Sequence, residues 1–154
     1  MSGIEIFHVT SANAGVSELL RNHHALMRSQ SPEESCHVMT ECELIASGCT
    51  VLACRRGATV IGVGAIKALD ADHAELKSMH TAEHARGTGV GRALLRALLD
   101  RARAAGHRRI SLETGTADQF APARALYAAH GFVDCPPFGT YRKDPLSVFM
   151  TRLL

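Results

Sequence analysis

The chain has 154 residues, of which 46% are hydrophobic and 21% charged, and its formal net charge at neutral pH is +2. This length favours one domain spanning residues 1–154, and the composition is that of an ordinary globular protein. The small net charge argues against a nucleic-acid partner. No apolar run approaches the roughly 20 residues of a membrane span, and no signal-peptide pattern is present, so we expect no membrane association.

The cysteines indicate the redox environment. They are odd in number and form no C-x-x-C pair, which is typical of reduced thiols rather than of a disulfide framework. We therefore expect a cytoplasmic protein. The five positions are Cys36, Cys42, Cys49, Cys54 and Cys135.

The first half of the sequence predicts a strand, two helices and three further strands. Apolar residues alternate where we expect strands and recur at helical spacing where we expect helices, and Gly57 marks a tight hairpin turn. In the third strand of this group, Ala74, Leu76 and Ser78 are expected to alternate with Glu75, Lys77 and Met79. In chain order the elements cover residues 5–10, 15–29, 41–46, 49–56, 58–69 and 73–81, with a loop at 31–35.

The second half predicts a helix, a strand, a second helix and two closing strands. The first helix ends near Gly106 and the second at Gly131, because glycine is a natural helix C-cap. In chain order the elements cover residues 90–106, 108–113, 121–131, 132–135 and 147–154, with a loop at 136–145.

Residues 85–92, ARGTGVGR, place three glycines within five positions directly before a helix. Helical N–H groups in the first turn have no intrahelical partner, and glycine lets an anion approach them closely. Arg86 and Arg92 flank the turn and can add charge-assisted hydrogen bonds to phosphate. Arg92 occupies the third-glycine position of a dinucleotide fingerprint, and no lysine follows Gly91 as a P-loop requires. The segment therefore predicts a phosphate site of another kind.

Read as R-x-x-G-x-G, with Arg86, Gly89 and Gly91 in the pattern positions, the loop resembles the pyrophosphate loop of the GCN5-related N-acetyltransferase (GNAT) family. The strand before the loop, the strand after its helix and A-L-Y-x-x-x-G-F at residues 125–132 follow at the family's spacing, so the resemblance spans residues 73–133. It implies an α/β fold with a mixed, mostly antiparallel sheet of six or seven strands and helices on both faces.

The resemblance also implies a function: transfer of acetyl from acetyl-CoA to a primary amine by direct attack in a ternary complex. Small amines, amino acids, aminoglycoside-like compounds and protein N-termini are all open as acceptors. A non-catalytic acyl-CoA-binding sensor is the main alternative, and an NAD(P)-dependent oxidoreductase is a third. The resemblance leaves a homodimer open.

In the donor site that the resemblance implies, the diphosphate sits on the glycine loop and the pantetheine arm runs along the preceding strand, which splays from its neighbour. An N–H of Met79 or His80 would polarise the thioester carbonyl. The implied cofactor-binding residues are Met79, His80, Thr81, Arg86, Gly87, Thr88, Gly89, Val90, Gly91 and Arg92.

Two catalytic roles follow from the resemblance. Tyr127 occupies the position of a tyrosine that donates to the CoA sulfur, and Glu113 that of a base glutamate. Glu75 and a water chain are rival bases. Phe120 stands where many relatives have asparagine, which leaves the path of residues 114–121 open.

The acceptor side has its own candidates. His23 and His24 lie on the first expected helix, which lines the acceptor site in related folds. Tyr141 to Asp144 form a polar loop that would close over the acceptor, with Arg142 available to a substrate carboxylate. His80 and His84 lack the glutamate of H-E-x-x-H and the helix it needs, so we expect no metal site.

Overall fold

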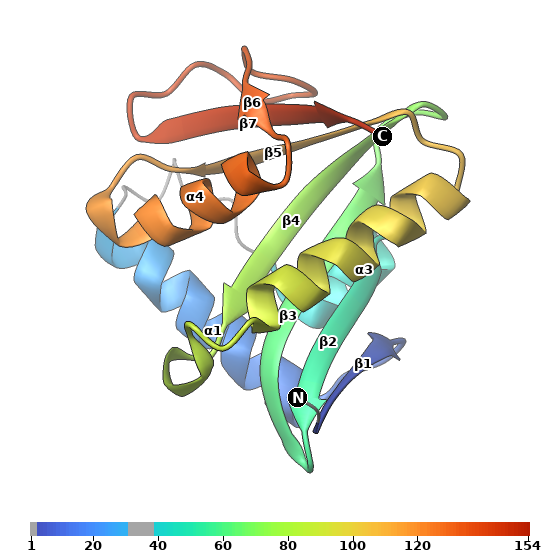
Figure 1. Cartoon of the computed structure of the whole chain (residues 1–154), viewed down its shortest axis with the longest axis vertical. Coiled ribbons are helices and arrows are strands. Elements are labelled where there is room, and N and C mark those ends of the chain that lie inside the picture. Colours follow the sequence, from blue (N-terminus) through green and yellow to red (C-terminus); the bar gives the residue numbers. More distant parts are fainter. Residues whose placement is uncertain (1–2, 31–38) are drawn as a thin grey trace.

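The computed structural model describes residues 3–30 and 39–154, in which helices cover both faces of a seven-stranded sheet (Figure 1). The predicted loop at 31–35 and Cys36 lie outside the described residues. The strands are β1 (Ile4–Val9), β2 (Thr50–Arg56), β3 (Thr59–Ala68), β4 (His73–Thr81), β5 (Arg109–Gly115), β6 (Val133–Asp134) and β7 (Ser147–Leu153). The helices are α1 (Ala14–Gln30), α2 (Glu41–Ala46), α3 (Val90–Ala104) and α4 (Ala121–Ala129), with short 3₁₀ turns η2 (Glu83–Ala85) and η3 (Asp118–Phe120).

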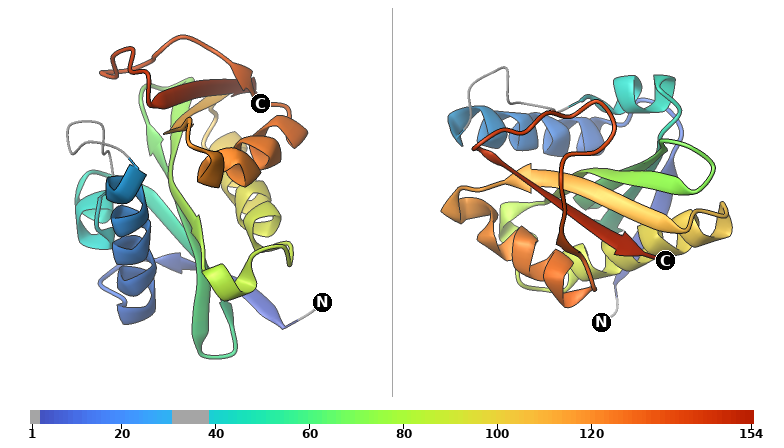
Figure 2. Two further views of the ribbon diagram at one scale, coloured as in Figure 1. Left: turned by 90° about the vertical axis from the view of Figure 1, so that its left-hand side faces the viewer. Right: turned by 90° about the horizontal axis from the view of Figure 1, so that it is seen from above.

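The sheet has the strand order β1-β2-β3-β4-β5-β7-β6, and only β4 and β5 pair in parallel. Helices α1 and α2 lie on one face, and α3 and α4 lie on the other (Figure 2). The predicted fold class is therefore confirmed, including the mostly antiparallel sheet and the helices on both faces. The element order is also as expected, although β6 is only two residues long instead of four.

The core forms where the apolar helix faces meet the sheet. Val16, Leu19 and Leu20 of α1 are buried on one face, and the leucines of α3 are buried on the other. Two glycines of β3 let α3 approach closely. A Cβ on Gly62 would lie 2.7 Å from the Leu94 Cδ1 atom, and one on Gly64 would lie 2.7 Å from the Leu98 Cδ1 atom. This close packing fixes the start of α3 against the sheet.

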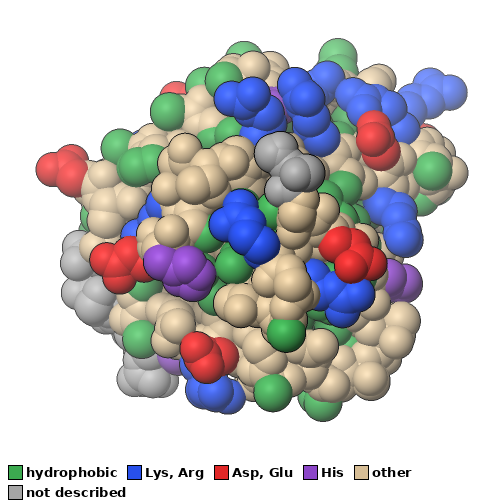
Figure 3. All heavy atoms as spheres, turned by 60° about the horizontal axis from the view of Figure 1, so that its bottom comes forward, with side chains coloured by type: hydrophobic (Ala, Val, Ile, Leu, Met, Phe, Trp, Pro, Cys, Tyr) green, Lys and Arg blue, Asp and Glu red, His purple; other side chains and the backbone are tan. Residues whose placement is uncertain are grey.

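No helix within the described ranges is long and apolar enough to cross a membrane. Charged side chains of both signs occupy the face seen in Figure 3, with Lys and Arg gathered along its upper margin.

Candidate active site

The site begins where the two parallel strands separate. β4 and β5 pair only from His73 opposite Arg109 to Leu76 opposite Leu112. Beyond Leu76, β4 continues to Thr81 and keeps its pairing with β3 alone. The edge of β4 that faces β5 therefore loses its sheet partner, which opens a slot through the middle of the sheet. The splay expected from the family resemblance is present.

Unpaired amides of β4 line this slot. The Ala82 N–H donates to the Ile61 carbonyl on the β3 side, at 2.8 Å. Because successive strand residues direct their backbone groups to opposite sides, the amides of Thr81 and Met79 face the slot and that of His80 faces β3. Two backbone donors are thus presented to a ligand in the slot.

The expected alternation holds from Ala74 to Lys77, but it was wrong from Ser78 onward, where a bulge interrupts β4. Ser78 has φ +59°, and the β3–β4 register shifts by one residue at this point. The extra residue moves His80 to the same face of the sheet as Glu75 and Lys77. These three residues pair with positions 63, 65 and 67 of β3, which share one face: Val63 with His80, Ala65 with Lys77, and Lys67 with Glu75.

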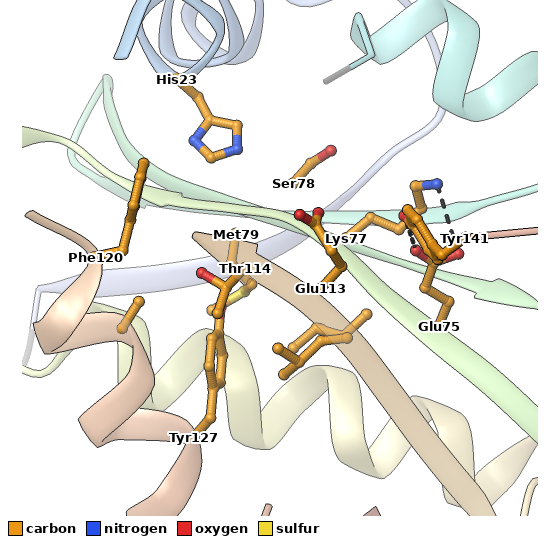
Figure 4. A pocket seen from close by; sticks show the side chains of 13 residues that line it. His23, Glu75, Lys77, Ser78, Met79, Glu113, Thr114, Phe120, Tyr127 and Tyr141 are labelled. Carbon is orange, nitrogen blue, oxygen red and sulfur yellow. Dashed lines mark hydrogen bonds and ion pairs between the residues drawn. The ribbon is translucent and has the colours of Figure 1, made fainter. Parts of the chain in front are cut away.

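The slot therefore connects two faces of the sheet that carry different side chains. Glu113 lies two residues beyond Ser111, the β5 partner of Glu75, so its side chain points to the α1 face with that of Glu75. Tyr127 approaches from α4 on the opposite face. Figure 4 shows the resulting pocket, with His23 above the strands, Tyr127 below them and Glu113 between them. An amine on one face can thus meet a thioester on the other.

The two carboxylates of the pocket have different surroundings. Glu75 is 4% exposed; its Oε2 atom accepts a hydrogen bond from the Tyr141 hydroxyl at 2.5 Å, and its Oε1 atom lies 3.6 Å from the Lys77 Nζ atom. Glu113 is half-buried and its Oε2 atom accepts from the Ser147 Oγ atom at 2.7 Å. Each Glu75 oxygen thus contacts another side chain, and the Glu113 carboxylate points into the pocket (Figure 4).

Tyr127 is 5% exposed and packs edge-on against Phe132, with ring centroids 5.8 Å apart. Burial raises the pKa of the Tyr127 phenol well above its usual value, so the hydroxyl stays protonated at physiological pH. Its hydroxyl donates to no acceptor within residues 3–30 and 39–154. A buried phenol that points toward the splayed strands can donate a proton to a ligand atom there.

His23 and His80 form a pair on the α1 face, with ring centroids 5.1 Å apart. Burial, then the neighbouring His80 and His24, lower the pKa of His23 to about 3. Burial and Arg86 lower the pKa of His80 to about 4. Both imidazoles are therefore neutral at physiological pH.

The glycine loop has the open backbone that an anion site needs. Gly87 and Gly89 adopt φ +77° and +91°, and a Cβ at either would meet nothing within 4 Å. Within the described part of the chain, the amides of residues 87–92 donate to no backbone acceptor. The first helical hydrogen bond of α3 runs from the Ala93 N–H to the Gly89 carbonyl. These amides and this space fit the diphosphate of a CoA donor.

The third glycine has a packing reason. A Cβ on Gly91 would lie 3.3 Å from the Leu126 Cδ2 atom of α4, so Gly91 lets α4 pack against the start of α3. Thr88 closes the turn by donating from Oγ1 to the Ala85 carbonyl at 2.5 Å. Arg86 and Arg92 are exposed beside the loop, and the Arg86 Nε atom donates to the Thr81 carbonyl at 3.4 Å. The loop, α4 and the end of β4 thus form one unit.

The structure brings several of the residues singled out in the sequence into one pocket. His23, Met79, Glu113, Tyr127 and the rival base Glu75 all line the pocket. From the loop at 136–145 Tyr141 lines it too, whereas Arg142 and Lys143 are exposed and contribute nothing to its wall. His24 lies next to His23 on α1, outside the pocket wall.

The path of residues 114–121 is now defined. Phe120 packs directly over Gly115, where any Cβ would lie 2.3 Å from the Phe120 Cδ2 atom. The Arg124 guanidinium donates to the carbonyls of Gly115 and Ala117, at 2.6 and 3.0 Å. Phe120 is therefore a buried wall residue of the pocket, and Arg124 holds the turn that carries it.

Three features escaped the sequence analysis: the bulge at Ser78, the bond between Tyr141 and Glu75, and the packing of His23 on His80. The bulge has no glycine to mark it, and both contacts join segments far apart in the chain. Within the described residues, no group of three or more His, Cys, Asp or Glu side chains could hold a metal ion.

Comparison with known sequences identifies relatives over almost the whole chain. The model of the acetyltransferase (GNAT) family matches residues 16–132. The uncharacterized N-acetyltransferase YsnE of Bacillus subtilis is 40% identical over 139 residues, covering 90% of this chain and 92% of the relative. An IAA acetyltransferase of Azospirillum brasilense is 37% identical over 156 residues, covering both chains completely.

Solved structures with the same fold include a candidate acyl-CoA N-acyltransferase from Klebsiella pneumoniae, with a TM-score of 0.81 and 27% identity over 98% of this chain and 97% of the other. A GNAT family acetyltransferase from Elizabethkingia anophelis, solved with acetyl-CoA bound, has a TM-score of 0.73 and 18% identity over all of both chains. The loop, the splayed strands and these relatives agree: the chain belongs to the GNAT acetyltransferase family.

Proposed function

We propose that this protein transfers the acetyl group of acetyl-CoA to a primary amine, and that the amine attacks the thioester directly in a ternary complex. The observation that carries the proposal is the slot between β4 and β5, with unpaired backbone amides at its edge and the open glycine loop beside it. A protein of the same fold binds acetyl-CoA.

The donor would be held by backbone groups on the α3 and α4 face. The amides of residues 87–92 receive the diphosphate, with Arg86 and Arg92 adding charge. The pantetheine arm runs along the free edge of β4, where Met79 and Thr81 present their N–H groups. Since the His80 amide faces β3, Met79 supplies the donor that polarises the thioester carbonyl and stabilises the oxyanion.

The chemistry then needs two proton movements. The neutral amine nitrogen attacks the carbonyl carbon, so a C–N bond forms and the C–S bond breaks. Glu113 takes the proton that the amine loses, directly or through water, on the acceptor face. Tyr127 donates its proton to the departing thiolate on the donor face. Burial keeps this phenol protonated until the thiolate forms.

Glu113 serves as the base in this proposal because Glu75 is already held by other side chains of the pocket. Both Glu75 oxygens are engaged, one by the Tyr141 hydroxyl and one by the Lys77 ammonium. Taking a proton on Glu75 would weaken a buried ion pair. Glu113 accepts a hydrogen bond from the Ser147 hydroxyl, and its carboxylate points into the pocket, where an amine could reach it.

The test is thiol release from acetyl-CoA with a panel of amines, each product confirmed by mass spectrometry. We expect amine-dependent release of CoA and one acetyl group on the nitrogen of the accepted amine. Tight binding of acetyl-CoA without transfer to any amine would favour the sensor function instead. Preference for NAD(P) over CoA in a thermal-shift screen would contradict both.

A further inference from the structure

One end of the pocket is closed by an aromatic ring that the proposed chemistry does not use. Phe120 lies in η3, is 7% exposed and lines the pocket. Among the described residues, it lies outside the continuous hydrophobic core of the protein. Ligand pockets are lined mainly by apolar and aromatic side chains, so a large ring buried beside a pocket is placed to pack against a ligand.

The ring lies on the acceptor face, next to Glu113. Glu113 and Gly115 are two positions apart on β5, so both positions face α1. A Cβ on Gly115 would lie 2.3 Å from the Phe120 Cδ2 atom, so the ring fills the space that a side chain at position 115 would occupy. Such positions on one strand face are about 7 Å apart. The ring can therefore contact the carbon chain of an amine whose nitrogen lies at Glu113.

Helices on both faces of the sheet hold the η3 turn that carries this ring. From α4, the Arg124 guanidinium donates to the carbonyls of Gly115 and Ala117, at 2.6 and 3.0 Å. On the other face, the Gln119 Nε2 atom donates to the Leu26 carbonyl of α1, at 3.4 Å. The ring is therefore fixed in place before an acceptor binds, which lowers the entropic cost of using it as a binding surface.

The opposite end of the pocket is occupied by other side chains of the protein. Tyr141 packs against Phe138 and Phe149, with ring centroids 5.2 and 5.5 Å apart, and its hydroxyl donates to Glu75, which pairs with Lys77. Figure 4 shows Tyr141, Glu75 and Lys77 at one end of the pocket and the η3 ring at the other. An acceptor at the centre of the pocket therefore extends its carbon chain toward the η3 ring.

The side chains at the η3 end are uncharged. Ala123, three residues after Phe120, also lines the pocket, and His23 faces it from α1. Burial, then the neighbouring His80 and His24, lower the pKa of His23 to about 3, so its imidazole is neutral at physiological pH. An apolar group gains free energy by leaving water here, whereas a charged group would lose its hydration.

We propose that Phe120 is the specificity wall of the acceptor site, and that the protein selects primary amines with an aromatic or other bulky apolar group close to the nitrogen. This inference rests on the proposed function and names its substrate class. A linker of two carbons suits the spacing between Glu113 and the ring over Gly115. Amines that carry a second ammonium group in place of the apolar one would be poor acceptors.

Matched pairs of acceptors test the selectivity. We would compare phenethylamine with ethylamine, and pentylamine with cadaverine, measuring kcat/KM for each with saturating acetyl-CoA. The first amine of each pair should be preferred by about 10-fold or more, the effect of burying a few apolar carbons. A smaller preference in either pair would overturn the inference while leaving the acetyltransferase intact.

Two substitutions of similar size test the wall itself. Phe120→Leu keeps an apolar surface and should keep a preference for phenethylamine over ethylamine above about fivefold, whereas Phe120→Asn should reduce it below about twofold. The KM for acetyl-CoA should stay within about twofold in both variants, because the ring lies on the acceptor face. A merely structural role would lower activity on both amines alike, so the same ratio in the two variants would overturn the assignment of Phe120.

Gly115 provides a second test that leaves the ring intact. Gly115→Ala must displace Phe120 and should lower the same ratio about threefold or more, whereas in a Phe120→Ala background it should change the ratio by less than about twofold. Gly62→Ala, whose Cβ would lie 2.7 Å from Leu94 in the core, is the control for a close contact elsewhere and should leave the ratio unchanged. Equal effects of Gly115→Ala in the two backgrounds would contradict a contact through the ring.

The panel also separates this inference from the function on which it rests. Failure of the wild type to acetylate any amine would overturn the proposed function, and this inference with it. Transfer to ethylamine as efficient as transfer to phenethylamine would overturn the inference alone.

Discussion

At the scale of single residues, the two tyrosines of the chain show how position sets the task of one side chain. Tyr141 donates to Glu75, and burial followed by that carboxylate raises its pKa well above the usual value. Tyr127 packs against Phe132, and burial raises its pKa as well. Both phenols stay protonated at physiological pH. The Tyr141 hydroxyl donates to Glu75, whereas the Tyr127 hydroxyl can donate to a ligand.

Removing the Tyr127 hydroxyl should affect the reaction and leave the fold unchanged. We expect Tyr127→Phe to lower kcat by about 100-fold, a typical contribution of a positioned general acid, with acetyl-CoA affinity nearly unchanged. Steady-state thiol release and calorimetric titration measure the two quantities. Full kcat in this variant would show that the thiolate departs without this proton.

The opposite pattern is expected at Tyr141. Tyr141→Phe takes the hydroxyl from a buried carboxylate, and an unsatisfied buried acceptor costs about 1–3 kcal/mol. Urea unfolding should show this loss for Tyr141→Phe and a change below about 0.5 kcal/mol for Tyr127→Phe, which loses the same atom. Equal free energies of unfolding for the two variants would contradict a stabilising hydrogen bond from Tyr141 to Glu75.

The histidine pair makes the stability depend on pH. The folded pKa values of His23 and His80, about 3 and about 4, lie below the ordinary 6.5, so the unfolded chain binds more protons between these limits. The free energy of unfolding therefore falls as the pH drops from 6.5 toward 4. Between pH 7 and pH 5, the free energy of unfolding should fall by about 1–2 kcal/mol less in His23→Leu than in the wild type.

The measurement is urea unfolding at both pH values, with His24→Leu as the control. That variant should keep the wild-type pH dependence. A His23→Leu protein whose stability falls as steeply as the wild type would mean that His23 titrates normally in the folded state.

At the scale of elements, the site depends on two irregular segments, and they differed in how far the sequence revealed them. The loop before α3 was recognisable because glycines and a helix start are local signals. The β4 bulge was not, since Ser78 is a non-glycine residue at positive φ, a conformation imposed by the surrounding sheet. Without the bulge, His80 would lie on the donor face and His23 would lack its neighbour.

A matched pair of glycines tests the loop. Gly89 and Gly57 both adopt positive φ with open space at the Cβ position, but Gly57 lies in the β2–β3 turn away from the pocket. Gly89→Val and Gly57→Val should each lose about 1–3 kcal/mol of stability through backbone strain. Only Gly89→Val should weaken acetyl-CoA binding, by about 10-fold or more, as measured by calorimetry. Equal affinities of the two variants would contradict a diphosphate at this loop.

At the scale of the whole molecule, the sequence predicted the elements and their order because periods of 2 and 3.6 residues are local properties. It could not predict which side chains meet across the slot. Tyr141 reaches Glu75 across 66 positions and holds one of the two carboxylates of the pocket. The division of the site into a donor face and an acceptor face likewise follows from strand pairing, which no local pattern encodes.

The account as a whole requires one bound geometry: a diphosphate on the amides of residues 87–92, with the thioester in the slot beside Tyr127. A crystal structure of the protein with acetyl-CoA tests this most directly. We expect the diphosphate oxygens within hydrogen-bond distance of those amides and the sulfur within reach of the Tyr127 hydroxyl. A cofactor bound elsewhere, with the loop amides unliganded and the slot closed, would contradict the account.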